Sequence, residues 1–292
     1  MTHTRLILLT MLAMTGFAAN SLLCRAALKG TGIDAASFTT IRLMSGALVL
    51  WLIVRISRRN VSGEGNWLSA VALVIYAAAF SFAYIQLTAA TGALLLFVAV
   101  QVTMIGYGAW SGDKLSGMQI IGLLIAIGGL ASLLLPGFAS PPLASALLML
   151  SSGVAWGVYS LRGRGTGDAT RISAGNFMRA AVVSVALSAI VITHGKATLD
   201  EAGVLYAVLS GALASGLGYV IWYIVLPELR PTIASTVQLS VPVLAAFGGV
   251  MFLGESVTVG LVLASAAILG GIALVILDRR ISANIGTSET KN

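Results

Sequence analysis

The stretch that decides the fold is FLGESVTVGLVLASAAILGGIALVIL, residues 252–277. A turn with a carboxylate, Gly254-Glu255, separates two apolar runs, and a Gly-Gly pair follows near the end of the second run. An earlier stretch, WSGDKLSGMQIIGLLIAIGGLASLLL at residues 110–135, has the same order of glycine, carboxylate, apolar run and Gly-Gly pair. One pattern in both halves of a chain indicates an internal duplication.

The composition is that of a membrane protein. Hydrophobic residues make up 58% of the 292 residues, charged residues only 9%, and the mean hydropathy is +0.98. About a quarter of the residues of a soluble domain are charged. Apolar runs of about 20 residues, enough to cross roughly 30 Å of hydrocarbon as a helix, follow one another along the chain. We therefore expect an all-α membrane protein of ten transmembrane helices, at residues 5–28, 35–57, 66–88, 91–110, 117–135, 142–162, 172–194, 202–226, 232–253 and 258–277.

The placement of positive charge predicts the topology. With the N-terminus inside, twelve of the 17 lysines and arginines fall on one set of loops and ends, and only Lys29 and Lys196 fall on the other. Positive charge stays on the cytoplasmic side. Both termini are therefore expected in the cytoplasm, in a multi-pass protein of the cell inner membrane. The net charge of +7 is explained by this asymmetry, so membrane lipids and not nucleic acid are the expected partners.

Several sequence landmarks occur in the same order in the two halves. A shift of 137 residues places GFAANSLLCR (16–25) on GVAWGVYSLR (153–162) and Arg42 on Arg179, and a shift of 142 places Asp113 on Glu255. Each half has five spans, and five is odd, so two copies in series enter the membrane from opposite sides. We expect two inverted five-helix repeats (5+5), at residues 1–138 and 139–280, followed by a cytoplasmic tail at 281–292. Many secondary transporters with alternating access have this arrangement.

The second repeat resembles a known family. The segment STVQLSVPVLAAFGGV (235–250) with the following FLGESVTVG is similar to the paired EamA modules of the drug/metabolite transporter superfamily. The resemblance is looser in the first repeat, where Thr103 replaces the proline and Asp113 the glutamate. Within the superfamily the chain most resembles exporters of aromatic and other amino acids. The resemblance implies ten helices in two inverted bundles and efflux of small metabolites.

Residues for catalysis or ion coupling are absent from the expected spans. All ten Asp and Glu residues lie in loops, tails or helix ends, both histidines are near span ends, and the chain has one cysteine. Acid–base or metal chemistry needs clusters of such residues, and an ion-coupled pump usually keeps a carboxylate near the midplane. We therefore expect no enzyme, no metal and no cofactor. Transport is expected to be uniport or facilitated, with Glu255 and Asp113 balancing helix dipoles.

A site for an amino acid must then come from neutral polar and aromatic side chains at mid-span. Amides provide both a donor and an acceptor, and aromatic faces hold apolar groups or an ammonium. For each aromatic residue, ordinary packing is the alternative. The candidate substrate-binding residues are Asn20, Tyr76, Phe80, Tyr84, Gln101, Trp156, Tyr159, Tyr219, Trp222, Gln238 and Ser240, with Ser21, Ser81 and Tyr223 beside them.

Three further residues are candidates for gating or structural roles. Arg42 and Arg179 lie about seven residues inside their spans, where a charge is costly. Either they reach toward the interface or hydrogen-bond within the bundle, or they face a polar cavity and contact the substrate. Pro242 interrupts the hydrogen bonding of its span, which produces either a fixed kink or a bend used for gating.

The leading hypothesis from sequence is a monomeric carrier that exports amino acids, aromatic and other neutral ones, with broad specificity. An exporter of drugs or other small metabolites is the alternative within transport. A non-transporting membrane scaffold or enzyme is the hypothesis from another class.

Overall fold

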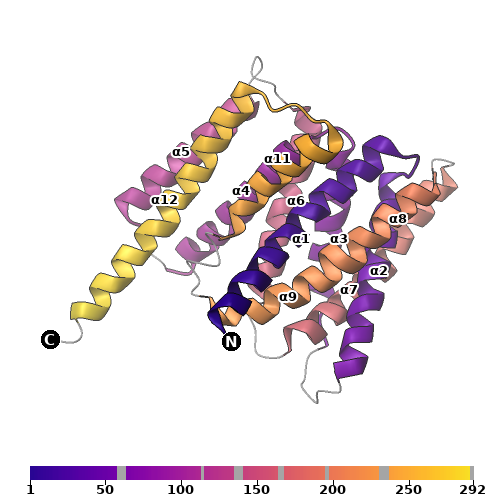
Figure 1. Ribbon diagram of the computed structural model, residues 1–292, viewed down its shortest axis with the longest axis horizontal. Helices are drawn as coiled ribbons and strands as arrows, with labels where there is room; N and C mark the ends of the chain where they lie inside the picture. The colour runs from indigo at the N-terminus through magenta and orange to yellow at the C-terminus, as the bar shows by residue number, and fades with distance from the viewer. Residues whose placement is uncertain are drawn as a thin grey trace.

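The computed structural model is a bundle of long helices (Figure 1). It describes residues 1–57, 64–112, 115–134, 141–163, 168–194, 197–229 and 237–289, with side chains up to residue 278. The helices of the first half are α1 (His3–Gly30), α2 (Ala35–Ser57), α3 (Trp67–Tyr84), α4 (Ala89–Trp110) and α5 (Gly117–Leu134). Those of the second half are α6 (Leu143–Arg162), α7 (Ala169–Thr193), α8 (Glu201–Leu209), η1 (Ser210–Leu217), α9 (Gly218–Val225), η2 (Leu226–Glu228), α11 (Ser240–Leu253) and α12 (Val259–Glu289).

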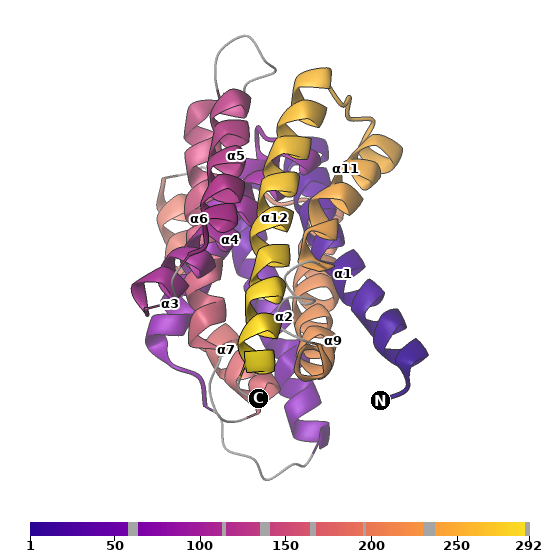
Figure 2. The same ribbon diagram turned by 90° about the vertical axis from the view of Figure 1, so that its left-hand side faces the viewer.

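The all-helical membrane architecture expected from the sequence is present. Within the described residues there is no strand, and nine helical segments are long and apolar enough to cross a membrane, Glu201–Glu228 counting as one. The ninth predicted span, 232–253, is described from residue 237 onward, and its helix α11 has 14 residues. α1 begins and α12 ends at the same end of the bundle (Figures 1 and 2). The inverted 5+5 relation and the cytoplasmic side of that end stay predictions.

Apart from the start of the predicted span 232–253, the helix ends lie within three residues of the predicted bounds, with two exceptions. α2 has the predicted bounds, whereas α3 ends at Tyr84, four residues before the predicted end. α12 continues past Leu277 to Glu289. Asn66 caps the start of α3: its side chain accepts a hydrogen bond from the Ser69 N–H at 2.8 Å, which satisfies a donor that the first turn leaves unpaired.

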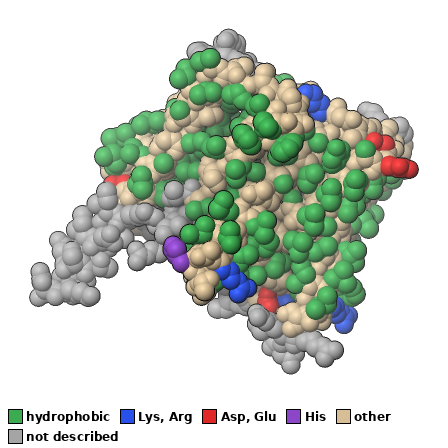
Figure 3. Space-filling model, viewed as in Figure 1, with side chains coloured by type: hydrophobic (Ala, Val, Ile, Leu, Met, Phe, Trp, Pro, Cys, Tyr) green, Lys and Arg blue, Asp and Glu red, His purple; other side chains and the backbone are tan. Residues whose placement is uncertain are grey.

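The outer surface of the bundle is apolar. Figure 3 shows hydrophobic side chains over most of the visible face, with charged side chains toward its margins. Large exposed side chains such as Leu8, Leu124, Val182 and Phe247 are more than 60% exposed. In water this surface would be unfavourable, whereas hydrocarbon accepts it, so this is a surface for contact with lipid.

Helices α5 and α12 pack against each other at one side of the bundle (Figure 1). A Cβ on Gly271 would lie 2.4 Å from the Gly122 carbonyl oxygen, and one on Gly129 would lie 2.9 Å from the Ala267 Cβ. The backbones therefore approach as closely as the small-residue pattern of the sequence indicates. The Ser116 hydroxyl also donates a hydrogen bond to the Asp278 carboxylate, so the pair is joined by side chains as well as by its backbone contact.

A buried ion pair connects the two halves at the end opposite the termini. Arg25 Nε lies 3.0 Å from Glu255 Oε1, and both side chains are less than 10% exposed. Arg25 also donates to the carbonyl oxygens of Tyr84 and Ile85, each at 2.9 Å. Glu255 Oε2 accepts from the Ala89 N–H at 2.8 Å. The Glu255 carboxylate thus interacts with the positive end of the dipole of α4. It does not cap the following helix α12, whose N-terminus is capped by Thr258.

Asp34 connects the loop before α2 to the loop before α8. Its Oδ1 accepts from the N–H groups of Ala36 and Ser37 at 3.0 and 2.9 Å, and its Oδ2 accepts from Thr198 N–H at 2.9 Å. Partial burial acts to raise the pKa of Asp34, but the hydrogen bonds from Ser37, Thr198 and Ala36 outweigh it and hold the pKa below its ordinary value. The ionised carboxylate is therefore the form that holds these loops together.

This lowered pKa predicts an acid-sensitive contribution to stability. Because the folded-state pKa lies below the unfolded value of about 3.9, the stabilisation is complete above that value and is lost as the pH falls through the folded pKa. We expect the Tm of the protein in detergent to decrease on acidification below about pH 4, and to decrease less in Asp34→Asn. Glu228→Gln, at an exposed carboxylate, is the control. Equal acid sensitivity of wild type and Asp34→Asn would contradict this account.

Candidate functional site

The span Glu201–Glu228 changes its helical form in the middle. Residues Ser210–Leu217 (η1) form a π-helix of eight residues between α8 and α9. A Cβ on Gly211 would lie 2.1 Å from the Arg42 carbonyl oxygen and 2.1 Å from Ser45 Oγ, so the η1 backbone lies directly against α2. π-Helical turns are rare and often occur at functional sites. Here the wide turn places the hydroxyls of Ser210 and Ser215 in the centre of the bundle.

A chain of buried hydrogen bonds runs through this centre. Ser210 Oγ donates to Asn20 Oδ1 at 2.7 Å, and Asn20 Nδ2 donates to the Tyr76 hydroxyl oxygen at 3.2 Å. The same Tyr76 oxygen accepts from Arg42 Nη2 at 2.9 Å, and Arg42 Nε donates to Ser215 Oγ at 3.4 Å. The network joins α1, α2 and α3 of the first half to η1 of the second.

Aromatic rings surround this network. Trp156 on α6 has its ring centroid 4.9 Å from Tyr76, 5.0 Å from Tyr219 and 5.4 Å from Tyr159. The Arg42 guanidinium carbon lies 5.1 Å from the Tyr76 ring centroid and 4.9 Å from that of Phe80, which are cation–π distances. Rings from both halves therefore meet at one point beside a buried positive charge.

The space between these rings is almost closed. The central cavity has a volume of about 20 Å³. A cavity of this size holds about one water molecule and has no room for a larger solute. The cavity is lined by Phe17, Asn20, Ser21, Tyr76, Phe80, Leu96, Phe97, Trp156, Ala214 and Tyr219.

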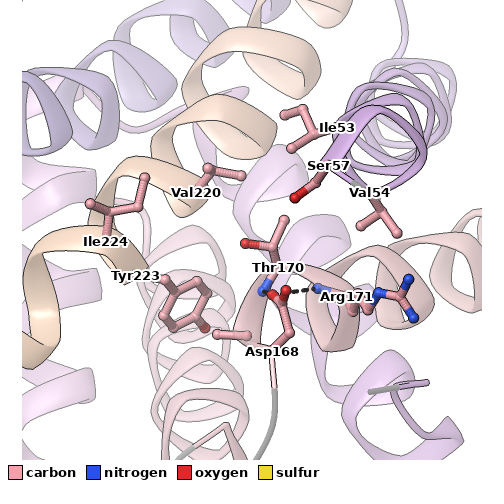
Figure 4. Close-up of a pocket in the computed structure, with 10 residues that line it drawn as sticks. Ile53, Val54, Ser57, Asp168, Thr170, Arg171, Val220, Tyr223 and Ile224 are labelled. Carbon is pink, nitrogen blue, oxygen red and sulfur yellow. Dashed lines mark hydrogen bonds between the residues drawn. The ribbon is translucent and has the colours of Figure 1, made fainter. Parts of the chain in front are cut away.

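A larger pocket of about 500 Å³ lies between the end of α2, the start of α7 and α9 (Figure 4). Asp168 in this pocket accepts hydrogen bonds from the Thr170 and Arg171 N–H groups at 2.8 and 3.3 Å, so its charge caps α7. Tyr223 projects into the pocket. Because Tyr223 follows Tyr219 by one helical turn on α9, one face of α9 passes from this pocket to the central cavity.

The structure brings together most of the predicted aromatic residues. Five of the candidate residues, Asn20, Tyr76, Phe80, Trp156 and Tyr219, line the central cavity directly, and so does Ser21. Three further candidates, Tyr84, Tyr159 and Trp222, are buried beside it. Tyr159 stacks on Trp156, Tyr84 contacts Phe80 at a centroid distance of 4.7 Å, and Trp222 packs edge-on against Phe17 at 6.0 Å.

Gln101, Gln238 and Ser240 are not among the residues that line the cavity. Gln101 is buried on α4 but is not among the lining residues, and it follows the lining residue Phe97 by one turn. Gln238 is half-buried just before α11. The Ser240 hydroxyl donates to the Val237 carbonyl oxygen at 2.6 Å, a local bond at the start of α11. Their role in substrate binding stays a prediction.

Arg42 and Arg179, which correspond in the sequence, have different surroundings. Arg42 is 1% exposed and lies inside the bundle, so it does not extend to the interface. Arg179 is half-buried, donates to the Gly175 carbonyl oxygen at 3.0 Å, and has its guanidinium 5.8 Å from the Trp67 ring centroid. Pro242 is the third residue of α11. The N–H groups of the first turn have no intrahelical acceptor, so a proline at this position costs the helix no hydrogen bond. The helix is interrupted at Leu239, near the carbonyl of residue 238 with which the proline ring would clash.

Several residues of the site were not predicted. Phe17 lines the cavity and lies one turn before Asn20, a spacing that places both on one helix face. Ser210 and Ser215 were not identified because small residues in a membrane span usually indicate close packing. Leu96, Phe97 and Ala214 carry no polar signal in the sequence.

Comparison with known proteins identifies the class. Residues 143–277 match the family model described as the EamA-like transporter family. A protein of Pseudomonas aeruginosa, named "Uncharacterized protein PA1977", is 55% identical over 280 residues, which cover 96% of this chain and 97% of that protein. The chain belongs to the EamA-like transporter family of the drug/metabolite transporter superfamily.

More distant relatives carry transport names. "Uncharacterized transporter YoaV" of Bacillus subtilis is 24% identical over 80% of this chain and 85% of its own. "Probable terminal-alkyne amino-acid exporter" of Streptantibioticus cattleyicolor is 26% identical over 79% of this chain and 80% of its own. A solved crystal structure with 19% identity superposes with a TM-score of 0.63 over 94% of this chain and 98% of the other, which supports the fold.

Proposed function

We propose that the protein is a secondary transporter that exports amino acids, aromatic and other neutral ones, across the bacterial inner membrane by alternating access. The observation that carries the proposal is the closed aromatic and polar cavity between helices of both halves. A similar arrangement of two halves around a central site can open to either face in turn. The relative named as an amino-acid exporter supports the choice of substrate.

Counterflow into liposomes tests this function. The purified protein is reconstituted with unlabelled phenylalanine inside, and uptake of labelled phenylalanine, leucine or alanine from outside is followed over time. We expect accelerated uptake of the amino acids compared with empty liposomes. Flux of other metabolites or drugs without any amino-acid flux would favour the alternative exporter, and no flux of any solute would favour a scaffold or an enzyme.

The proposed transport is facilitated and not driven by an ion. Among the described residues, Glu255 is the only Asp or Glu that is buried, and it is paired with Arg25 near a helix end. We therefore expect that a proton or sodium gradient alone does not concentrate amino acids in the liposomes. Accumulation driven by either gradient would contradict this part of the proposal.

Trp156 provides the sharpest test of the pathway. Its indole contacts three tyrosine rings, and each aromatic pair contributes about 0.5–1.5 kcal/mol beyond buried area. We expect Trp156→Ala to reduce the counterflow rate by about tenfold or more, and Trp156→Phe to retain much of the activity. Gln101→Ala should also reduce the rate, by less.

Trp110→Ala is the matched control, because the Trp110 side chain is 89% exposed at the end of α4. Each variant is checked for membrane insertion and for its Tm in detergent. Normal counterflow in a well-inserted Trp156→Ala would mean that the solute passes elsewhere.

A further inference from the structure

The central cluster has more hydrogen-bond donors than acceptors. Arg42 Nη1 is buried and has no hydrogen-bond partner in the part of the chain that the structure describes, and the same is true of the Tyr219 hydroxyl. The Tyr76 hydroxyl oxygen already accepts from both Arg42 and Asn20. Within the described part of the chain, the cluster therefore lacks an acceptor for these two donors.

Among the residues that the structure describes, Arg42 also lacks a counter-ion. Neither of the two ion pairs found there includes it: these join the Met1 amine to Glu228 and Arg25 to Glu255. A guanidinium remains protonated in a protein, and a buried charge without a partner is strongly unfavourable. Its other contacts are neutral hydroxyls and the rings of Tyr76 and Phe80. A ligand that brings a negative charge would therefore be held by this residue.

From these contacts we propose that Arg42, assisted by Tyr219, binds the carboxylate of the transported solute, an inference that rests on the proposed function. Tyr219 lines the central cavity, and so does Tyr76, to which Arg42 donates a hydrogen bond. A planar guanidinium matches a carboxylate with two parallel N–H···O bonds. Arg42 Nη1 provides a free donor, and the Tyr219 hydroxyl provides a second one from the other half of the chain. The recognised class is then carboxylate-bearing solutes, and amines without a carboxylate are excluded.

Competition in the counterflow assay tests the solute class. Uptake of labelled phenylalanine is measured with excess unlabelled phenylalanine, 3-phenylpropionate, phenethylamine or phenylalaninamide outside. Phenylalanine and 3-phenylpropionate, which carry the carboxylate, should inhibit. Phenethylamine and phenylalaninamide, which lack it, should not. Inhibition by the two amines as strong as that by phenylalanine would overturn the inference and leave the transport function intact.

Substitution of Arg42 tests the residue. In Arg42→Gln the apparent affinity for phenylalanine should fall by about 30-fold or more, as expected when one partner of a buried charged pair is removed. Arg42→Lys keeps the charge but loses the bidentate hydrogen-bonding geometry, and its affinity for phenylalanine should be intermediate. Arg55→Gln, the same change at an exposed position of α2, is the control and should behave as wild type. Wild-type affinity in Arg42→Gln would overturn the inference.

Ligand-induced stabilisation tests carboxylate binding at Arg42 independently of transport. In detergent, phenylalanine should raise the Tm of the wild type, whereas phenethylamine should not, and Arg42→Gln should lose the response without a lower Tm of its own. A carboxylate-dependent rise in Tm without any flux would support the binding site and contradict the transport function. A rise produced equally by chloride or phosphate would show a site for inorganic anions and overturn the proposal.

Discussion

Glu255→Gln is expected to lower the free energy of unfolding by about 3–5 kcal/mol, because it leaves one member of a buried ion pair without its partner. The Arg25 and Glu255 side chains are 8% and 5% exposed, and the atoms of the pair are 3.0 Å apart. In the variant, an amide NH₂ group faces either Arg25 or the Ala89 N–H, and both of these are donors. The variant should therefore show a markedly lower Tm in detergent.

A matched control isolates burial as the cause. Glu228→Gln removes an exposed carboxylate, 47% exposed and 3.9 Å from the N-terminal amine, and exposed pairs contribute about 0–1 kcal/mol. A double variant, Arg25→Met with Glu255→Leu, should recover much of the lost stability, since apolar replacement of a buried pair is often neutral. If Glu255→Gln and Glu228→Gln have equal effects, the pair does not hold the two halves together as described.

Gly271→Ala is expected to separate α5 from α12. The new Cβ would lie 2.4 Å from the Gly122 carbonyl oxygen and 2.7 Å from the Ala126 backbone nitrogen. These are backbone atoms that cannot rotate away, so the helices must move apart, at a cost of about 1–3 kcal/mol or more. Because α5 packs chiefly on α12, we expect a lower Tm and increased protease cleavage near α5.

The neighbouring glycines provide the controls. A Cβ on Gly270 or on Gly128 would meet nothing within 4 Å, and both residues are exposed. Gly270→Ala and Gly128→Ala should change the stability by no more than about 1 kcal/mol. Gly129→Ala should behave like Gly271→Ala, since its Cβ would approach Ala267 and Ile268 on α12. A similar loss in all four variants would mean that close approach is not the cause.

The sequence predicts the fold well because lipid imposes a simple rule. Apolar runs of about 20 residues become helices, and the bounds of α2 are correct to the residue. The predicted end of α3 is wrong because residues 85–87 are part of the same largely apolar run. The helix ends where Arg25 donates hydrogen bonds to the carbonyl oxygens of Tyr84 and Ile85. A long-range hydrogen bond of this kind leaves no local pattern.

The residue types predict part of the candidate site. The features that depend on tertiary contacts could not be predicted from the sequence. Trp156 and Tyr76 are recognisable because they are aromatic residues near the middle of their spans. Arg42 and Arg179 align when the sequence is shifted by 137 residues, yet one is buried at the centre and the other is half-buried beside Trp67. The π-helix at Ser210–Leu217 depends on the contact of Gly211 with α2, which the sequence alone does not reveal.

The crowding of rings around Trp156 also gives the protein an optical property. Indole emission depends on the polarity and the mobility of its surroundings, and here the indole lies within about 5.5 Å of three phenol rings. A solute that occupies the cavity must displace at least one of these rings or admit water beside it. In the proposed transport cycle, Trp156 is therefore an intrinsic fluorophore at the point where occupancy changes, and filling of the centre should change its emission against that of the other four tryptophans.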